Sequence, residues 1–249
     1  MASTRKPSAT KPQPKTKAGP KTKGRPETKT RAKSEPKPKT RAPRKPKAPP
    51  DPWADALAHL RAIDEKWAAR IEKVGPCRME IRQDRFATLV RAIVGQQIST
   101  KAARSIDQRL RDLVGDIHEP ESLLKAGLDA LRSVGLSGVK AQYILNLAEA
   151  VLSGTVPIHE FHEWEDEAIV ASLTSIKGIG PWTAEMFLIF CLGRPDVISP
   201  GDLGIRAGVK NHHGLDAMPT PKQCRELTES WRPYRSVAMW YLWREIDPQ

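Results

Sequence analysis

The stretch Leu173–Ala184 reads LTSIKGIGPWTA and places two glycines around one isoleucine, directly before a proline. Glycine tolerates left-handed backbone and lets another group approach closely, so Gly178 and Gly180 predict a tight turn. Proline is favoured in the first turn of a helix, so Pro181 predicts a helix whose first amides face that turn. Such a turn can bind a phosphodiester, and Lys177 would add a positive charge. The same pattern also occurs where a turn only caps one helix and begins the next, and the stretch alone leaves both alternatives open.

Apolar residues on both sides of this turn recur with helical spacing. One stripe consists of Phe86, Leu89, Val90, Ile93 and Val94. A second, after Gly138, consists of Ile144, Leu147, Ala148 and Val151, and a third, after Pro181, of Met186, Phe187, Ile189 and Phe190. Residues at i, i+3, i+4 and i+7 lie on one face of a helix, and no convincing period-2 alternation intervenes. The sequence therefore predicts an all-α fold.

A weak internal repeat supports this prediction. Leu131–Gly135 matches Leu173–Lys177, and each segment precedes another helical pattern. Both indicate two helices joined by a tight turn that contains glycine. Further along, Thr220 and Pro221 predict an N-cap and first helical residue, with the helix running toward Ser230.

A second informative stretch, Val197–Arg206, reads VISPGDLGIR, and its aspartate lies 22 residues after Gly180. Pro-Gly-Asp is typical of a turn into a helix, and Asp202 occupies the position of an N-cap. A capping aspartate needs no further function. The residues alone favour that simple role.

The charge of the chain is concentrated at its N-terminus. Residues 1–50 contain no Val, Ile, Leu, Phe, Tyr or Trp, and they carry 17 Lys/Arg, 2 Glu and 11 prolines. Their net charge is +15. Because the whole chain has a net charge of +12, residues 51–249 carry −3. Such a segment cannot bury enough apolar surface to fold, so we expect a disordered basic tail followed by one domain over 51–249. The tail would attract DNA or another polyanion without reading its sequence, or would only solvate the chain.

Cysteine and hydropathy patterns exclude several classes of protein. Cys77, Cys191 and Cys224 lie far apart, which argues against a disulfide framework, a zinc site or an iron–sulfur cluster. No run of 18 apolar residues and no secretory signal are present, so we expect no membrane association. These patterns predict a cytoplasmic protein, or a nuclear one if the source is eukaryotic.

At three blocks the sequence resembles the helix-hairpin-helix DNA glycosylase superfamily, and within it the bacterial alkylation-repair branch, DNA-3-methyladenine glycosylase II. The blocks are Ala92–Ser99 (AIVGQQIS), the hairpin with its following Pro-Gly-Asp, and Trp231–Ser236 (WRPYRS), within a match across residues 75–245. The resemblance implies a two-subdomain helical fold. It also implies base-excision repair, in which the bond between a damaged base and its deoxyribose is hydrolysed.

The resemblance assigns roles to individual residues. Asp202 matches the essential carboxylate, which stabilises the oxocarbenium-like sugar as the base departs. Gln97, with Gln96 beside it, matches the wedge that fills the gap left by the flipped nucleotide. The residues expected to contact the DNA backbone are Lys177, Gly178, Ile179 and Gly180.

The resemblance also implies a base pocket. Trp182 and Trp243 match aromatic residues that stack on the damaged base, and Met186 and Leu203 stand where pocket tyrosines can occur. Gly201 stands where a second acid can occur. Alkylation at a ring nitrogen makes a purine cationic, and an indole face attracts a desolvated cation by up to about 2 kcal/mol. A pocket of this kind is expected to favour alkylated bases.

Bifunctional members of the superfamily carry a lysine where this chain has Trp182, so we expect hydrolysis without strand cleavage. No iron–sulfur cluster is expected, because the C-terminal region has only Cys224. Relatives bind a monovalent cation through hairpin carbonyls, which would here be those of Thr174, Ile176 and Ile179.

The sequence thus predicts a monomeric, DNA-associated glycosylase that removes alkylated purines of the 3-methyladenine type from double-stranded DNA. One alternative is a glycosylase of the same fold that acts on mispaired or oxidised bases. The other is a noncatalytic DNA-binding or chromatin protein that uses the hairpin and the tail alone. A carboxylate near DNA phosphates argues against a mere binder, because it would repel them.

Overall fold

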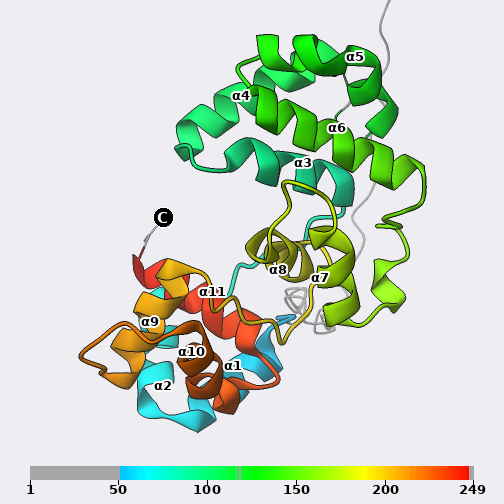
Figure 1. The fold of residues 1–249 in the computed structure, drawn as a ribbon. Helices are drawn as coiled ribbons and strands as arrows, with labels where there is room; N and C mark the ends of the chain where they lie inside the picture. The colour runs from blue at the N-terminus through cyan, green and yellow to red at the C-terminus, as the bar shows by residue number, and fades with distance from the viewer. Residues whose placement is uncertain (1–50, 116, 118, 247–249) are drawn as a thin grey trace, which may run out of the picture. The chain divides into compact units, whose positions relative to one another are not determined.

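Helix is the only regular structure among residues 51–115, 117 and 119–246, the part of the chain described by this computed structural model (Figure 1). The α-helices are α1 (Ala54–Ile63), α2 (Glu65–Val74), α3 (Arg85–Gly95), α4 (Thr100–Val114), α5 (Pro120–Ser133), α6 (Gly138–Leu152), α7 (Asp166–Thr174), α8 (Pro181–Phe190), α9 (Leu203–His213), α10 (Pro221–Leu227) and α11 (Arg235–Ile246). Two short 3-10 helices are η1 (Phe161–Glu163) and η2 (Glu229–Trp231). The all-α prediction is confirmed, whereas the predicted tail, residues 1–50, lies outside the described residues.

The predicted stripes lie on the inner faces of their helices. All five apolar residues of the first stripe, on α3, are buried. On α6 the stripe is buried except for Val151, which is partly exposed, and α8 buries Phe187 and Ile189. The buried apolar residues form one continuous cluster, so a single core supports all these helices. None of the described helices has the length and apolar character needed to cross a membrane.

The described helices pack in two groups. One group consists of α3, α4, α5 and α6, and the other is built around α1, α2, α9, α10 and α11. Helix α8 packs against both α7 and α3. Figure 1 shows the two groups as separate sets of helices, with α7 and α8 beside α3. This grouping agrees with the expected two-subdomain helical fold.

Helix starts follow from local capping. Pro181 and Pro221 begin α8 and α10, and Thr220 completes a capping box with Gln223. A capping box satisfies two of the free amides at a helix start. The α10 helix ends at Leu227, before the predicted Ser230, and the chain continues as η2. Both predicted helix-turn-helix units are present, as α5–α6 and α7–α8.

A buried histidine joins α9 to α2. His212 is 2% exposed, its Nδ1 lies 2.8 Å from Arg70 and its Nε2 lies 3.1 Å from Asp64. Arginine only donates, so Nδ1 must accept, and the proton resides on Nε2, which donates to Asp64. Burial lowers the pKa of His212 to about 4, although the neighbouring Asp64 carboxylate acts in the opposite direction. Its neutral form therefore belongs to the folded state.

Candidate active site

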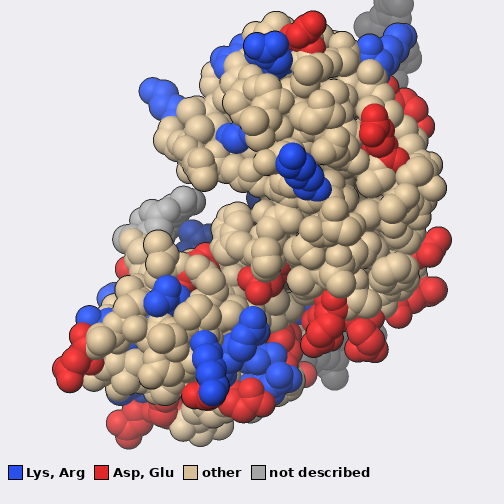
Figure 2. All heavy atoms as spheres, viewed as in Figure 1, with Lys and Arg blue, Asp and Glu red and all other residues tan. Residues whose placement is uncertain are grey.

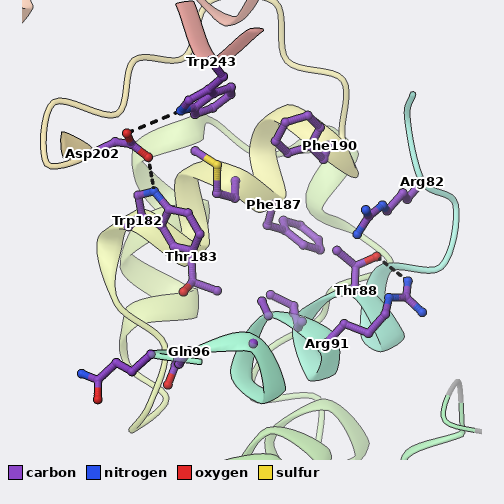
Figure 3. Close-up of a pocket in the computed structure, with 15 residues that line it drawn as sticks. Arg82, Thr88, Arg91, Gln96, Trp182, Thr183, Phe187, Phe190, Asp202 and Trp243 are labelled. Carbon is purple, nitrogen blue, oxygen red and sulfur yellow. Dashed lines mark hydrogen bonds between the residues drawn. The ribbon is translucent and has the colours of Figure 1, made fainter. Parts of the chain in front are cut away.

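A cavity of about 510 Å³ is lined by residues of α3, α8 and α11 and by the residue that precedes α9. Ligand cavities in proteins commonly measure about 300–1,000 Å³, so this one is large enough for a small molecule or a single nucleobase. Its walls are mainly apolar and aromatic (Figure 3). The space-filling view shows the surface hollowed between the two helix groups (Figure 2). On that face, basic side chains are interspersed with acidic ones.

Asp202 lies at the edge of this cavity and is held by donors from three helices. As predicted, it is the N-cap of α9, and its Oδ1 accepts the Ile205 amide at 2.8 Å. Its Oδ2 accepts the indole Nε1–H of Trp182 at 2.8 Å, and Oδ1 lies 3.4 Å from the Nε1 of Trp243. Figure 3 shows the carboxylate between the two indoles. These contacts fix the direction in which the carboxylate faces.

This arrangement leaves part of the Asp202 carboxylate free for a further contact. Hydrogen-bond donors and the start of a helix both stabilise a negative charge. A carboxylate has about four lone-pair sites, and the three donors leave one of them for a further partner. Asp202 is only partly buried, so that partner can approach from the cavity. The site can therefore stabilise positive charge or orient one water molecule.

Aromatic side chains form one wall of the cavity. Trp182, Met186 and Phe190 lie four residues apart on α8 and all line the cavity, opposite Trp243 from α11. The rings of Phe190 and Trp243 are 6.0 Å apart. Trp182 is 46% exposed, so its ring is available for contact. Phe190 was predicted only as part of an apolar helical stripe, although its spacing from Trp182 could have placed it in the pocket.

Leu203 differs from the other residues predicted for the base pocket. Its side chain is 69% exposed and is not part of the cavity lining. It is the first residue of α9, directly after the cap. The structure thus brings together Trp182, Met186 and Trp243, but not Leu203.

The cavity has a polar end that the sequence analysis missed. Arg82, Thr88 and Arg91 line it, and Figure 3 shows them on the side away from Asp202. Arg91 forms an ion pair with Asp84, which also accepts the Thr88 hydroxyl. Burial alone would raise the pKa of Asp84, but the Arg91 guanidinium lowers it overall. No sequence spacing singled out these residues, which come from α3 and from the irregular segment before it.

A second, partly buried acid supports the segment that leads to Asp202. The Ser199 hydroxyl donates to Glu185 of α8 at 2.5 Å, and the Ser199 carbonyl accepts the Asp202 amide at 3.1 Å. Burial raises the pKa of Glu185. This contact ties the Pro-Gly-Asp turn to the helix that carries Trp182.

The two hairpin glycines have different physical roles. Gly178 has φ +106°, and a Cβ there would lie 2.2 Å from the ring of Tyr143. Gly180 has an ordinary φ of −94°, and a Cβ there would meet nothing within 4 Å. Gly178 is thus required by the fold, whereas Gly180 leaves open space beside the start of α8. The prediction of left-handed backbone holds for Gly178 only.

The other residues predicted for the hairpin differ in exposure. Lys177 is exposed, whereas Ile179 is 4% exposed and its amide donates to the Ile176 carbonyl at 3.0 Å. The Ile179 side chain therefore anchors the turn, and only its backbone carbonyl is left to meet a ligand. The Thr174 carbonyl, also predicted to bind a cation, is in the last residue of α7.

The predicted wedge lies directly after α3. Gln97 is exposed and has φ +54°, the only positive φ of a non-glycine residue in the described part of the chain. Gln96 is different, because its side-chain amide donates to the Gly178 carbonyl at 2.9 Å. Left-handed backbone is uncommon outside glycine and often marks a functional turn. Gln97 is therefore presented to solvent, whereas Gln96 links the wedge turn to the hairpin.

The described part of the chain contains no group of three or more His, Cys, Asp or Glu side chains close enough to hold a metal ion. Cys77, Cys191 and Cys224 are each buried as free thiols. The expected absence of a cluster stays a prediction.

The chain is similar in sequence to known DNA-repair proteins. A family model described as HhH-GPD superfamily base excision DNA repair protein matches residues 90–233. DNA-3-methyladenine glycosylase 1 of Schizosaccharomyces pombe is 36% identical over 75% of this chain and 84% of its own length. DNA-3-methyladenine glycosylase 2 of Escherichia coli is 31% identical over 64% of this chain and 57% of its own length.

Solved structures give the same result. A DNA-3-methyladenine glycosidase from Bacillus halodurans has a TM-score of 0.70 and 38% identity, and the match covers 77% of this chain and 89% of that one. The 3-methyladenine DNA glycosylase of S. pombe, solved in complex with abasic DNA, has a TM-score of 0.68 and 35% identity, covering 76% and 95%. The chain therefore belongs to the HhH-GPD superfamily of base excision DNA repair proteins.

Proposed function

We propose that this chain is a monofunctional DNA glycosylase, which hydrolyses the N-glycosidic bond of alkylated purines in double-stranded DNA and leaves an abasic site. The observation that carries the proposal is Asp202, an oriented carboxylate at the edge of an aromatic cavity. Relatives at 31–36% identity are named DNA-3-methyladenine glycosylases, and one of them was solved with abasic DNA, the product expected from such a reaction.

The cavity would select the base through charge and shape. An alkylated purine that carries a positive charge would lie against Trp182 and Trp243, whose indole faces attract a desolvated cation by up to about 2 kcal/mol. The positive charge also weakens the glycosidic bond, because the departing base leaves as a neutral molecule. A binding protein without catalysis would not need a carboxylate at the edge of this cavity.

Asp202 would act on the sugar. As the glycosidic bond breaks, its electron pair goes to the base nitrogen, and positive charge develops on C1′ and the ring oxygen. The carboxylate stabilises that charge electrostatically. Its remaining lone pair accepts a proton of one water, whose oxygen forms the new bond to C1′. Trp182 has no amine that could attack C1′, so strand cleavage through a Schiff base is not expected at this position.

Contact with DNA is assigned to the turns around the cavity. The hairpin would bind the phosphate backbone through Lys177 and the open backbone at Gly180, and Gln97 would fill the gap left by the flipped nucleotide. Residues 51–249 carry a net charge of −3, so we expect the tail over 1–50 to supply most of the nonspecific attraction to DNA. We expect a monomer, which sedimentation in solution would test.

A monovalent cation would fit the hairpin. Carbonyl oxygens are suitable ligands for hard cations, and those of Thr174, Ile176 and Ile179 belong to one turn. The Ile176 carbonyl already accepts one amide and retains a second lone pair. A bound cation would add positive charge near a DNA phosphate.

Single-turnover release of base from alkylated duplex DNA tests the proposal. The wild type should release base, Asp202→Asn should not, and strand breaks should form only after alkali. Asparagine has one acceptor oxygen, so its amide must face either Ile205 or Trp182, and stability and DNA binding must be measured for this variant too. Asp216→Asn, at an exposed position, makes the same charge change outside the cavity. Equal release by wild type and Asp202→Asn would refute the assignment of Asp202.

A further inference from the structure

A lysine from a distant part of the chain holds the end of α3. The ammonium group of Lys140, in the first turn of α6, donates to the carbonyl of Val94 at 2.9 Å and to that of Gln96 at 2.6 Å. The last carbonyls of a helix lack partners within the helix and carry its negative dipole end. Lys140 satisfies two carbonyls immediately before Gln97. Partial burial lowers the pKa of Lys140.

The same face of α6 supports the hairpin. Tyr143 lies three residues after Lys140, and side chains with this spacing are neighbours on a helix surface. The ring of Tyr143 packs where Gly178 has no side chain. Gln96 then closes the connection, because its amide donates to the Gly178 carbonyl. One turn of α6 therefore contacts both the wedge turn and the hairpin.

We propose that Lys140 is a positioning residue for base flipping: it fixes the turn that presents Gln97 at a set distance from the hairpin. This inference rests on the function proposed above. Lys140 would not touch the reacting atoms. It would hold the turn in one conformation, so that Gln97 is already placed to enter the duplex while the hairpin holds the phosphate.

A positioning role predicts a dependence on the base opposite the lesion. Flipping a well-paired base requires unpairing and unstacking, and a mismatched base requires less. A loosely held Gln97 should therefore slow the removal of a paired base more than that of a mismatched one. General damage to the fold or to the chemistry would slow both equally.

The experiment compares single-turnover rates at saturating enzyme on one site-specifically alkylated purine, placed opposite its normal partner or opposite a mismatched base. The variants are Lys140→Met, Lys140→Gln and Lys140→Arg. Lys125→Met removes the same charge at an exposed position of α5 and serves as control. Thermal unfolding of every variant identifies those that do not fold.

Lys140→Met and Lys140→Gln should lose about tenfold on the paired site and less than about twofold on the mismatched site, which needs less help in flipping. Lys140→Arg retains several donors and should recover most of the loss. Equal losses on both substrates, or no loss on either, would overturn the inference. If the wild type released no base from either substrate, the proposed function itself would fail, and the inference with it.

Discussion

Replacing Trp182 by phenylalanine removes one hydrogen-bond donor from Asp202 and keeps an aromatic ring at the edge of the cavity. The indole Nε1–H donates to Oδ2 at 2.8 Å, a short bond to a charged acceptor. Without it, Oδ2 keeps no donor from the described residues, and the carboxylate is oriented mainly through Oδ1. We expect slower base release, because fewer of the carboxylate conformations face the sugar.

The structure sets the size of this effect. Hydrogen bonds to charged groups contribute about 1.5–3 kcal/mol, and the 46% exposure of Trp182 lets water compete, so the lower value applies. A loss of about 1.5 kcal/mol in the transition state corresponds to roughly a tenfold slower reaction. The Trp243 contact is longer, at 3.4 Å, so Trp243→Phe should lose only about 0.5 kcal/mol, or roughly twofold.

The assay is single-turnover base release at saturating enzyme, which separates chemistry from binding. Trp182→Phe and Trp243→Phe are matched, since each exchanges one indole for one phenyl ring. Unchanged rates in both variants would show that the indoles act only as stacking surfaces. A faster Trp182→Phe enzyme would refute the reasoning. In that case the hydrogen bond from Trp182 would reduce the ability of the carboxylate to stabilise positive charge by more than it helps to orient the carboxylate.

Three further predictions concern stability and DNA binding. Gly178→Ala combines a strained φ with a clash against Tyr143 and should destabilise the fold by at least about 2 kcal/mol in urea unfolding. Gly180→Ala should change the free energy of unfolding by less than about 0.5 kcal/mol while weakening DNA binding. Equal stabilities of the two variants would contradict this. Because the pKa of His212 is lowered in the folded state, the unfolded state binds a proton more readily as the pH falls. The contribution of neutral His212 to the free energy of unfolding is full above pH 6.5 and falls by roughly 3 kcal/mol as the pH drops toward 4. His212→Gln should make the free energy of unfolding depend less on pH in this range. Removing residues 1–50 should leave single-turnover base release unchanged and make DNA affinity less dependent on salt, and an unaltered salt slope would show that the tail does not contact DNA.

Much of the fold could be predicted because local patterns and tertiary packing agree. The apolar stripe of α3 is buried at every predicted position, and the cap at Thr220 begins α10 as expected. The end of α10 was less predictable. The Thr228 hydroxyl donates back to the Cys224 carbonyl, and the chain then forms η2, so helical spacing continues beyond the α-helix itself.

The site could be predicted less completely, because its contacts join distant positions. Two of the three hydrogen bonds that orient Asp202 come from residues 20 and 41 positions away, and no spacing rule connects them. Trp182 and Trp243 were interpreted as stacking surfaces, and the use of their N–H groups was not foreseen. The DNA contact expected of Gln96 stays a prediction, and the hydrogen bond from its amide to the hairpin was not foreseen. A glutamine side chain can bind DNA or another part of the protein, and the sequence alone does not show which partner it has.

Capping and catalysis, treated as alternatives for Asp202 on sequence grounds, are compatible in the structure. An N-cap serine would satisfy the Ile205 amide equally well, but it would offer no charge to a developing oxocarbenium ion. Aspartate does both, since Oδ1 caps the helix while Oδ2 faces the indole of Trp182. The cap also fixes the carboxylate at the start of α9, where the positive end of the helix dipole attracts negative charge. For this residue the structural role is therefore part of the proposed chemistry, because the same hydrogen bond that begins α9 sets the direction of the carboxylate.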